Sequence, residues 1–295
     1  MPHRSVRRRS PGLAGVAWIA MGLYALFLLY PLLQSLLTSF TDRSPLKAHS
    51  SFVGLENYTA MLSDHRLHDS LRFTGIVVVV VTVVANAVGL GFAMLLNRGG
   101  RHYRAMRTLV FLPQVLSGVI VAFIWRSILT QDGLLNSALG RLGVTDSPIP
   151  WLGTPGLATF AICLTVSWIT IGFATVVYTA SLQSVPAELY EAARMDGAGA
   201  SGRFRHVTVP MIAPGTTITV VLCLITTFKL YDVVAVLTGG GPAESTRTTA
   251  YYLVTVAFTN NKFGYSSAIA MLLLVLTAVV AYGTTAILRR READL

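Results

Sequence analysis

The sequence predicts an all-α polytopic membrane protein with six transmembrane helices and one long polar loop on the inner side. Three observations lead to this prediction. The 295 residues are 53% hydrophobic and only 12% charged, which is too apolar for an ordinary soluble domain of this length. Six apolar runs are long enough to cross a bilayer, and the basic residues gather at the ends of these runs.

Each apolar run is assigned one helix, because a hydrocarbon core of about 30 Å requires about 20 residues of α-helix. The predicted spans are residues 13–37, 71–96, 106–129, 157–182, 211–237 and 267–288. They form a single transmembrane domain over residues 13–295, preceded by a basic segment at residues 1–12. The first run is too long for the core of a signal peptide, so we expect it to remain as the first transmembrane helix.

The distribution of Lys and Arg predicts which side of the membrane each loop faces. The N-terminus, the loop 97–107, the loop 185–210 and the C-terminal tail together carry fourteen of these residues. The loops on the opposite side carry seven. Because cytoplasmic loops hold the excess of basic residues, both termini and the 185–210 loop are predicted to be cytoplasmic.

Composition excludes several other classes of protein. The net charge of +10 does not indicate nucleic-acid binding, because the basic residues mark the ends of apolar runs instead of forming one patch. Cys163 and Cys223 lie inside apolar runs, so neither a disulfide framework nor a zinc site is expected. His65 and His68 have the spacing of a metal pair, but no second cluster supports them, and we predict no metal site.

Three further features are expected along the chain. Pro113 should kink the third helix, because proline has no N–H for the helical ladder and Gln114 follows it at membrane depth. Arg126, at the outer end of the same helix, is interpreted as an anchor that reaches toward lipid headgroups. Tyr58, in the first outer loop, is expected to lie in the aromatic belt at the outer interface.

The polar loop at residues 185–210 begins as a helix. Pro186 suits a first helical turn, where its missing N–H costs nothing. Glu188 and Glu191 follow near the positive end of the helix dipole, which favours negative charge. The loop is therefore predicted to be structured.

The same loop bends after two turns. Ala192 and Ala193 leave a small apolar face that lets another protein approach closely. Asp196 and Gly197 end the first piece, because glycine accepts the left-handed conformation that closes a helix. A second short helix is predicted to run on to Pro210.

Four stretches of the sequence carry a family resemblance. They read EAARMDGA at 191–198 with VTVP at 207–210, FVGLENY at 52–58, LTGGGP at 237–242, and AFTNNKFGYSSA at 257–268. Together they resemble the permease subunits of binding-protein-dependent ABC importers, and among these the larger permease of the carbohydrate-uptake family, the maltose and glycerol-phosphate type. The resemblance covers nearly the whole chain. Val207 and Val209 depart from the more usual isoleucine and leucine but keep the apolar character.

The resemblance implies an assembly in a bacterial plasma membrane. Its expected partners are a second related permease, two ABC ATPase subunits and an extracytoplasmic solute-binding protein. ATP and magnesium would bind the ATPase subunits, so no cofactor is expected on this chain, which also lacks a G-x-x-x-x-G-K-[ST] motif. The residues implied in docking to an ATPase are Glu188, Glu191, Ala192, Ala193, Asp196 and Gly197.

Polar residues at membrane depth are candidates for the solute path. In the fourth and fifth helices these are Ser167, Trp168, Thr170, Thr226, Thr227, Lys229 and Asp232. Small hydroxylated residues also serve as packing contacts between membrane helices, which is the default interpretation of the fourth helix. Lys229 and Asp232 share one face and are equally consistent with a mutual salt bridge that only stabilises the fifth helix.

Three functions from different classes were weighed. The favoured one is a non-catalytic permease that moves a sugar or sugar-like solute, with glycerol-phosphate derivatives or amino sugars as alternatives on the same scaffold. A stand-alone secondary transporter would show inverted repeats, interrupted helices or a buried carboxylate relay, and only Asp232 lies at depth. A membrane enzyme would need a clustered His, Glu or Cys constellation, which the sequence does not contain.

Overall fold

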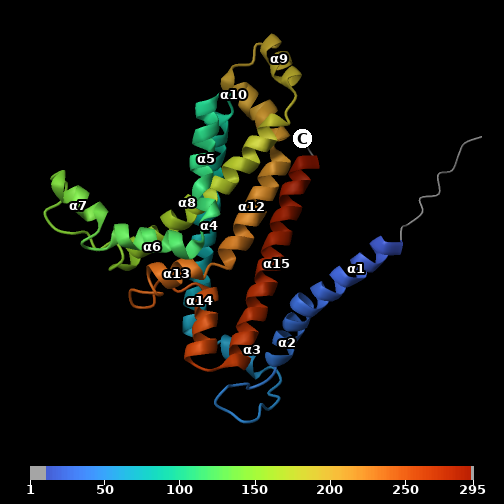
Figure 1. Ribbon diagram of the computed structural model, residues 1–295, viewed down its shortest axis with the longest axis vertical. Coiled ribbons are helices and arrows are strands. Elements are labelled where there is room, and N and C mark those ends of the chain that lie inside the picture. The colour runs from blue at the N-terminus through green and yellow to red at the C-terminus, as the bar shows by residue number, and fades with distance from the viewer. Residues whose placement is uncertain (1–10, 294–295) are drawn as a thin grey trace, which may run out of the picture. The chain divides into compact units, whose positions relative to one another are not determined.

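A computed structural model describes residues 11–293 of the chain, and this range is helical almost throughout (Figure 1). Within it the only pairing of extended segments is an isolated bridge between Thr41 and Phe52. Five helices are long and apolar enough to cross a membrane, and the count reaches six if one bent pair forms a single span. The all-α membrane fold is therefore confirmed. Of the basic segment predicted at 1–12, residues 1–10 lie outside the described range.

The described chain divides into two compact units, residues 11–63 with 255–272 and residues 64–254 with 273–293. The first unit holds α1 (Pro11–Tyr24), a π-helical turn (Ala25–Leu29), α2 (Tyr30–Thr38), α3 (Glu56–Met61), a second π-helical turn (Thr255–Thr259) and the start of α15 (Phe263–Ala293). Helix α15 continues into the second unit.

Residues of the FVGLENY motif form hydrogen bonds with the chain reversal that follows α2. The side-chain amide of Asn57 donates to the carbonyl oxygens of Ser39 and Thr41, at 2.8 and 2.9 Å. The hydroxyls of Tyr58 and Ser39 lie 2.7 Å apart, and Ser39 is fully buried. Tyr58, predicted to lie in the interfacial belt, thus has a hydrogen-bonding role that the sequence does not reveal.

The GYSSA motif at the start of α15 packs against the same chain reversal. The backbone N–H of Gly264 donates to the Arg43 carbonyl at 3.0 Å. A Cβ at Gly264 would overlap the Thr41 carbonyl oxygen, which is backbone and cannot rotate away. Two motifs far apart in the sequence therefore meet at one junction, and only glycine fits there.

Gly264→Ala is expected to destabilise the protein by about 1–3 kcal/mol, as overpacked sites do. Gly283→Ala in the same helix is the matched control, because nothing lies within 4 Å of the Cβ it would add. Thermal unfolding of the two purified variants in one detergent compares them directly. Equal midpoints would contradict the proposed close fit at Gly264.

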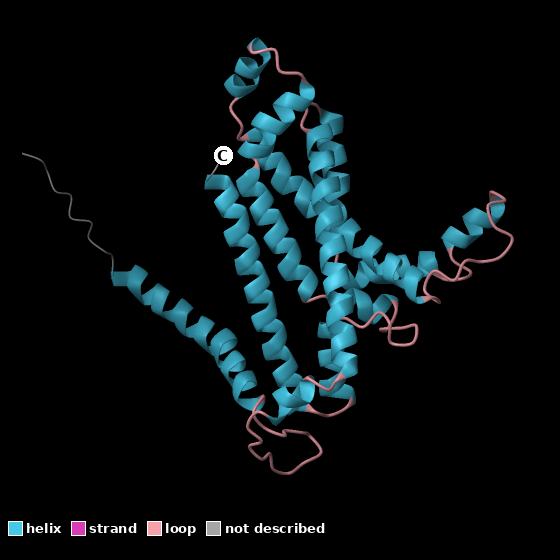
Figure 2. Cartoon of the chain, turned by 180° about the vertical axis from the view of Figure 1, so that it is seen from behind, coloured by secondary structure: helices cyan, strands magenta, loops and turns pink. Residues whose placement is uncertain are grey.

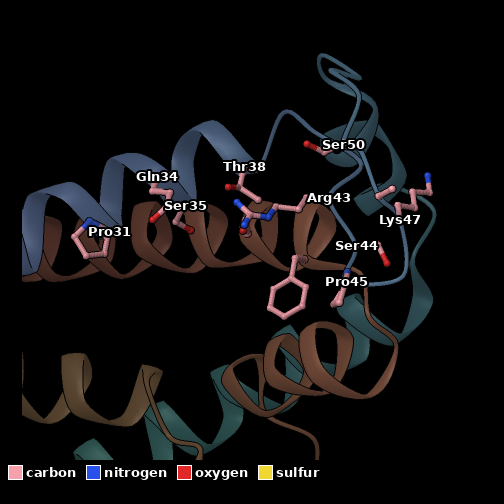
Figure 3. Close-up of a pocket in the computed structure, with 12 residues that line it drawn as sticks. Pro31, Gln34, Ser35, Thr38, Arg43, Ser44, Pro45, Lys47 and Ser50 are labelled. Atoms are coloured by element: carbon pink, nitrogen blue, oxygen red, sulfur yellow. The ribbon is translucent and has the colours of Figure 1, made fainter.

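A hollow of about 700 Å³ opens in the first unit beside α2, and Figure 3 shows that polar side chains line it together with Pro31 and Pro45. Lys47 Nζ lies 2.5 Å from Asp42 Oδ2 in the loop that borders it. This hydrogen bond from Lys47, with another from the Ser51 backbone, lowers the pKa of Asp42 to about 2. The pair is exposed, so it orders the loop without adding much stability.

The second unit contains the remaining helices. They are α4 (His65–Leu96), α5 (Arg101–Val115), α6 (Gly118–Leu129), α7 (Leu134–Arg141), α8 (Pro155–Gln183), α9 (Ala187–Met195), α10 (Ala200–Arg203), a π-helical turn (Phe204–Thr208), α11 (Val209–Met211), α12 (Ala213–Phe228), α13 (Asp232–Leu237) and α14 (Thr249–Val254). Helix α8 packs along α4 and also contacts α5 and α12. Helices α6 and α7 extend away from these four (Figure 2).

Glycines allow the helices around α8 to approach closely. A Cβ at Gly89 of α4 would lie 2.5 Å from the Cβ of Ala174, and one at Gly172 of α8 would lie 2.7 Å from the Val110 carbonyl of α5. A Cβ at Gly215 of α12 would overlap the Ser181 hydroxyl. Small residues at helix crossings are the usual basis of packing in membranes, where no hydrophobic effect drives helices together.

Two of the predicted spans are not single helices. The span 106–129 is interrupted at Leu116 and Ser117, whose backbones are extended, with ψ of 147° and 138°. Pro113 lies near this break, and a kink alone was the wrong expectation.

The span 211–237 is interrupted between α12 and α13, and Thr248 Oγ1 donates to the freed Leu230 carbonyl at 2.6 Å. Buried hydroxyls can thus replace helical hydrogen bonds at a break.

Arg126 was predicted to reach outward to headgroups. Its guanidinium instead donates to the Val236 carbonyl near the end of α13, at 3.0 Å. Arg126 therefore caps the end of α13. The last carbonyl groups of a helix have no hydrogen-bond partner within the helix, so a nearby arginine can donate to them.

Candidate functional site

The polar loop at residues 185–210 folds as predicted into two short helical pieces joined by a bend. Helix α9 projects beyond the end of α8 in Figure 1. Glu188, Glu191, Ala192 and Asp196 are exposed, Ala193 is half-buried, and Met195 is 88% exposed. Most of α9 therefore faces away from the rest of the described chain.

The bend after α9 depends on Gly197, whose φ of +77° is left-handed. The N–H of Ala198 donates to the Ala193 carbonyl at 2.9 Å, and the Arg203 guanidinium donates to the Ala198 carbonyl at 3.0 Å. Other residues reach this conformation at a cost, so glycine fits the position best. The loop consequently has a defined shape.

The base of the loop is tied to the membrane helices. The hydroxyls of Tyr190 and Thr208 lie 3.1 Å apart and link α9 to the π-helical turn that leads into α11. Tyr190 also packs against an apolar cluster whose buried members are Ala93, Ala174, Tyr178, Leu182, Val185 and Ile212. The base of α9 is therefore packed against side chains of α8 and α4.

A cavity of about 360 Å³ lies where the two broken spans face α8. Its walls come from both sides of the α5–α6 break and of the α12–α13 break. The lining residues are Gln114, Leu116, Gly118, Val166, Ile169, Thr170, Phe173, Leu222, Cys223, Thr226, Thr227, Leu230, Asp232 and Val233. Irregular backbone at membrane depth is tolerated where it borders a cavity or is covered by protein.

The structure brings together only part of the predicted solute path. Thr170, Thr226, Thr227 and Asp232 line the cavity. The others do not line it: Ser167 is buried among helices, Trp168 is 38% exposed with its ring edge-on to Trp125 at 5.8 Å, and Lys229 is exposed.

Asp232 opens α13 and lies against the first residue of α6. Its Oδ1 accepts a hydrogen bond from the Val233 N–H at 2.9 Å, and a Cβ at Gly118 would overlap its Oδ2. Among the described side chains, no ion pair joins Asp232 to Lys229. The alternative of a stabilising salt bridge between these two residues is therefore not seen.

Gln114, Gly118 and Phe173 are lining residues that were not among the predicted solute-path residues. A signal for the first break exists in the Ser117-Gly118 pair, since serine often begins a helix and glycine permits close approach. This break was not predicted, because the apolar run continues on both sides of the Ser117-Gly118 pair. No group of three or more His, Cys, Asp or Glu among the described residues could hold a metal ion.

The glycine run of the LTGGGP motif forms a compact loop after α13. Gly239 and Gly240 have φ of 60° and 80°, and a Cβ at Gly240 would lie 2.8 Å from Arg247 Cγ. Thr246 Oγ1 closes the loop by donating to the Gly241 carbonyl at 2.5 Å. The motif is structural here and has none of the features of a phosphate-binding loop.

Comparison with known proteins agrees with this architecture. A family model for the binding-protein-dependent transport system inner membrane component matches residues 56–293. The sulfoquinovosyl glycerol transport system permease protein SmoG of Agrobacterium fabrum is 34% identical, covering 92% of this chain and 88% of its own. The trehalose/maltose transport system permease protein MalF of Thermococcus litoralis is 36% identical over 78% of each chain.

A solved structure shares the fold. A bacterial ABC transporter involved in the import of the acidic polysaccharide alginate aligns with a TM-score of 0.83 at 20% identity, covering 94% of this chain and 95% of the other. The same fold is also solved in complex with an alginate-bound periplasmic protein, with a TM-score of 0.83 at 19% identity over 95% and 94% of the two chains. The chain thus belongs to the family of inner membrane components of binding-protein-dependent transport systems and is a membrane-spanning, non-catalytic ABC permease subunit.

Proposed function

We propose that this chain is the permease subunit of an ATP-driven importer that moves a sugar or sugar-like solute delivered by an extracytoplasmic binding protein. The observation that carries the proposal is an exposed helix, α9, fixed by its base to the membrane helices of a chain in this family. Relatives named as lactose and trehalose/maltose permeases support the choice of a sugar.

Helix α9 is the proposed docking element for a separate ATPase subunit. Its exposed carboxylates and small alanines would seat in a groove of that partner, and Gly197 would set the angle of the loop. Because Tyr190 and Thr208 connect α9 to the base of the loop, motion of the ATPases would reach α8 and α12. ATP and magnesium would bind those ATPase subunits.

The arrangement of the complete assembly follows from this role. The excess of basic residues supports a cytoplasmic position for both termini and for α9. A second permease would complete the pore, two ATPases would meet the two docking loops, and the binding protein would meet the outer loops. The cavity at the two helix breaks is the proposed section of the solute path.

Reconstitution of the complex in lipid vesicles tests the proposal. Uptake of labelled lactose, maltose or trehalose should require ATP on the cytoplasmic side of the vesicle membrane and the binding protein on the opposite side. Secondary transporters also contain broken helices. Uptake by this chain alone, without ATP or partner subunits, would overturn the importer in favour of that alternative.

Thr226→Val should raise the KM for uptake by about 3- to 10-fold, the equivalent of one neutral hydrogen bond. Thr226 lines the cavity and is exposed to it, so the change removes a polar contact without altering volume much. Uptake measured over a range of solute concentrations gives the KM, while solute-stimulated ATP hydrolysis reports whether coupling is intact. Trp168→Ala, measured in parallel, tests whether the path also passes this tryptophan outside the cavity. An unchanged KM in Thr226→Val would place the path elsewhere.

A further inference from the structure

The cavity contains one formal charge. Of its fourteen lining residues, Asp232 alone is ionisable to a full charge at neutral pH. No ion pair of Asp232 occurs among the described side chains, and Lys229, three residues earlier, is exposed. The lining of the cavity therefore carries one formal negative charge and no cationic side chain.

The hydroxyls of the cavity reinforce this polarity. Thr170 Oγ1 donates to the Val166 carbonyl at 2.7 Å, and Thr226 Oγ1 donates to the Leu222 carbonyl at 2.8 Å. Since each hydroxyl has one hydrogen and two lone pairs, these oxygens remain mainly as acceptors toward the cavity. These two hydroxyls therefore favour a solute that supplies donors, although the amide of Gln114 in the same lining can also donate.

The Asp232 carboxylate also occupies the start of α6, which is where an anionic group of a solute would otherwise bind. Gly118 begins α6, a helix of twelve residues, and the Asp232 carboxylate lies directly against it. The start of a helix favours negative charge, and the side chain of Asp232 already lies at the start of α6. The protein thus occupies with its own side chain the spot where an anionic group of a solute would be best stabilised.

We infer that Asp232 determines the charge class of the solute, so that the cavity admits neutral or amino sugars and rejects sugars that carry a carboxylate, sulfonate or phosphate. Hydroxyl and ammonium groups would donate to the carboxylate and to the threonine oxygens. The inference rests on the proposed function, because it places the solute path in this cavity. It separates glycerol-phosphate derivatives, which it excludes, from amino sugars, which it favours.

The charge of the cavity can be measured without transport. Thr226→Cys, in a background with Cys163→Ala and Cys223→Ala, places one accessible thiol on the cavity wall of the assembled complex. The rates of its modification by a trimethylammonium and by a sulfonate methanethiosulfonate reagent are followed by the mass of this chain. A nearby carboxylate should accelerate the cationic reagent and slow the anionic one, each about 10-fold relative to Asp232→Asn.

Asp146→Asn is the matched control, because it removes an equal charge from an exposed loop outside the cavity. It should leave the ratio of the two rates within about 2-fold of the parent value. A ratio that is the same in Asp232→Asn and in the parent would overturn the inference. Because no solute or ATP is involved, such a result would leave the importer assignment itself standing.

A second measurement uses the same thiol and asks which solutes protect it from modification. It connects the charge of Asp232 with the class of solute that enters the cavity. Maltose and glucosamine, at concentrations that saturate the effect, should slow modification of Thr226→Cys, whereas glucuronate should not. Adding Asp232→Asn should allow glucuronate to protect as well. Equal protection by glucuronate and maltose in the parent complex would overturn the inference.

Discussion

Glu191→Lys is expected to reduce ATP-dependent uptake by at least about 10-fold while the protein still inserts into the membrane. Glu191 is exposed on α9, on the element proposed to dock with the ATPase, so its side chain is available to a partner. Residues at the centre of a docking surface commonly contribute more than 2 kcal/mol to binding. Reversal of the charge adds repulsion to the loss of contact.

Gly197→Ala tests the same loop through its shape instead of its charge. The φ of +77° disfavours a side chain by about 1–2 kcal/mol, although the space around Gly197 is open. Gly199→Ala is the control, because Gly199 has ordinary φ of −67° and equally open surroundings. Uptake and solute-stimulated ATP hydrolysis should fall in Gly197→Ala and Glu191→Lys but not in Gly199→Ala. Full coupling in both test variants would refute the docking role of α9.

Gly89→Ala should have the largest effect on stability of any single methyl group added to α4. The new Cβ would lie 2.5 Å from Ala174 Cβ and 3.2 Å from the Thr175 backbone nitrogen, at the contact between α4 and α8. Neither atom can rotate away, so the helices must separate, at a cost of about 1–3 kcal/mol. The midpoint of thermal unfolding in detergent and the yield of assembled complex measure this cost.

Gly91→Ala provides the comparison for that experiment. It lies two residues further along the same helix, and nothing lies within 4 Å of its added Cβ. The helix propensities of the two substitutions are the same, so only the packing differs. If both variants unfold at the same temperature, α4 and α8 do not meet as closely at Gly89 as the structure indicates.

Local signals were sufficient to predict two of the long membrane helices and the helical loop at residues 185–210. Pro186 and Gly197 mark the two ends of α9, and both act through backbone conformations that a single residue type determines. The membrane spans 71–96 and 157–182 lie within α4 and α8, since long apolar runs identify such helices directly.

The breaks in the third and fifth spans could not be predicted in the same way. Leu116 and Leu230 are apolar residues in apolar runs, and their non-helical conformations depend on partners distant in the sequence. Thr248 supplies the hydrogen bond for the Leu230 carbonyl, and Gly118 provides the space for Asp232. A hydropathy pattern contains no information about such partners, so the cavity and the separation of Lys229 from Asp232 emerged only in three dimensions.

The two interruptions also affect how the protein could change its preference during evolution. Where a helix stops, its main-chain amides and carbonyls become available, and they are present whatever side chains a mutation introduces. Thr248 already binds the Leu230 carbonyl, but other main-chain groups left free at a break would still bind the hydroxyl groups of a solute when individual side chains change. One or two substitutions in the cavity lining could then create a new specificity, and the intermediate variants would still bind a solute.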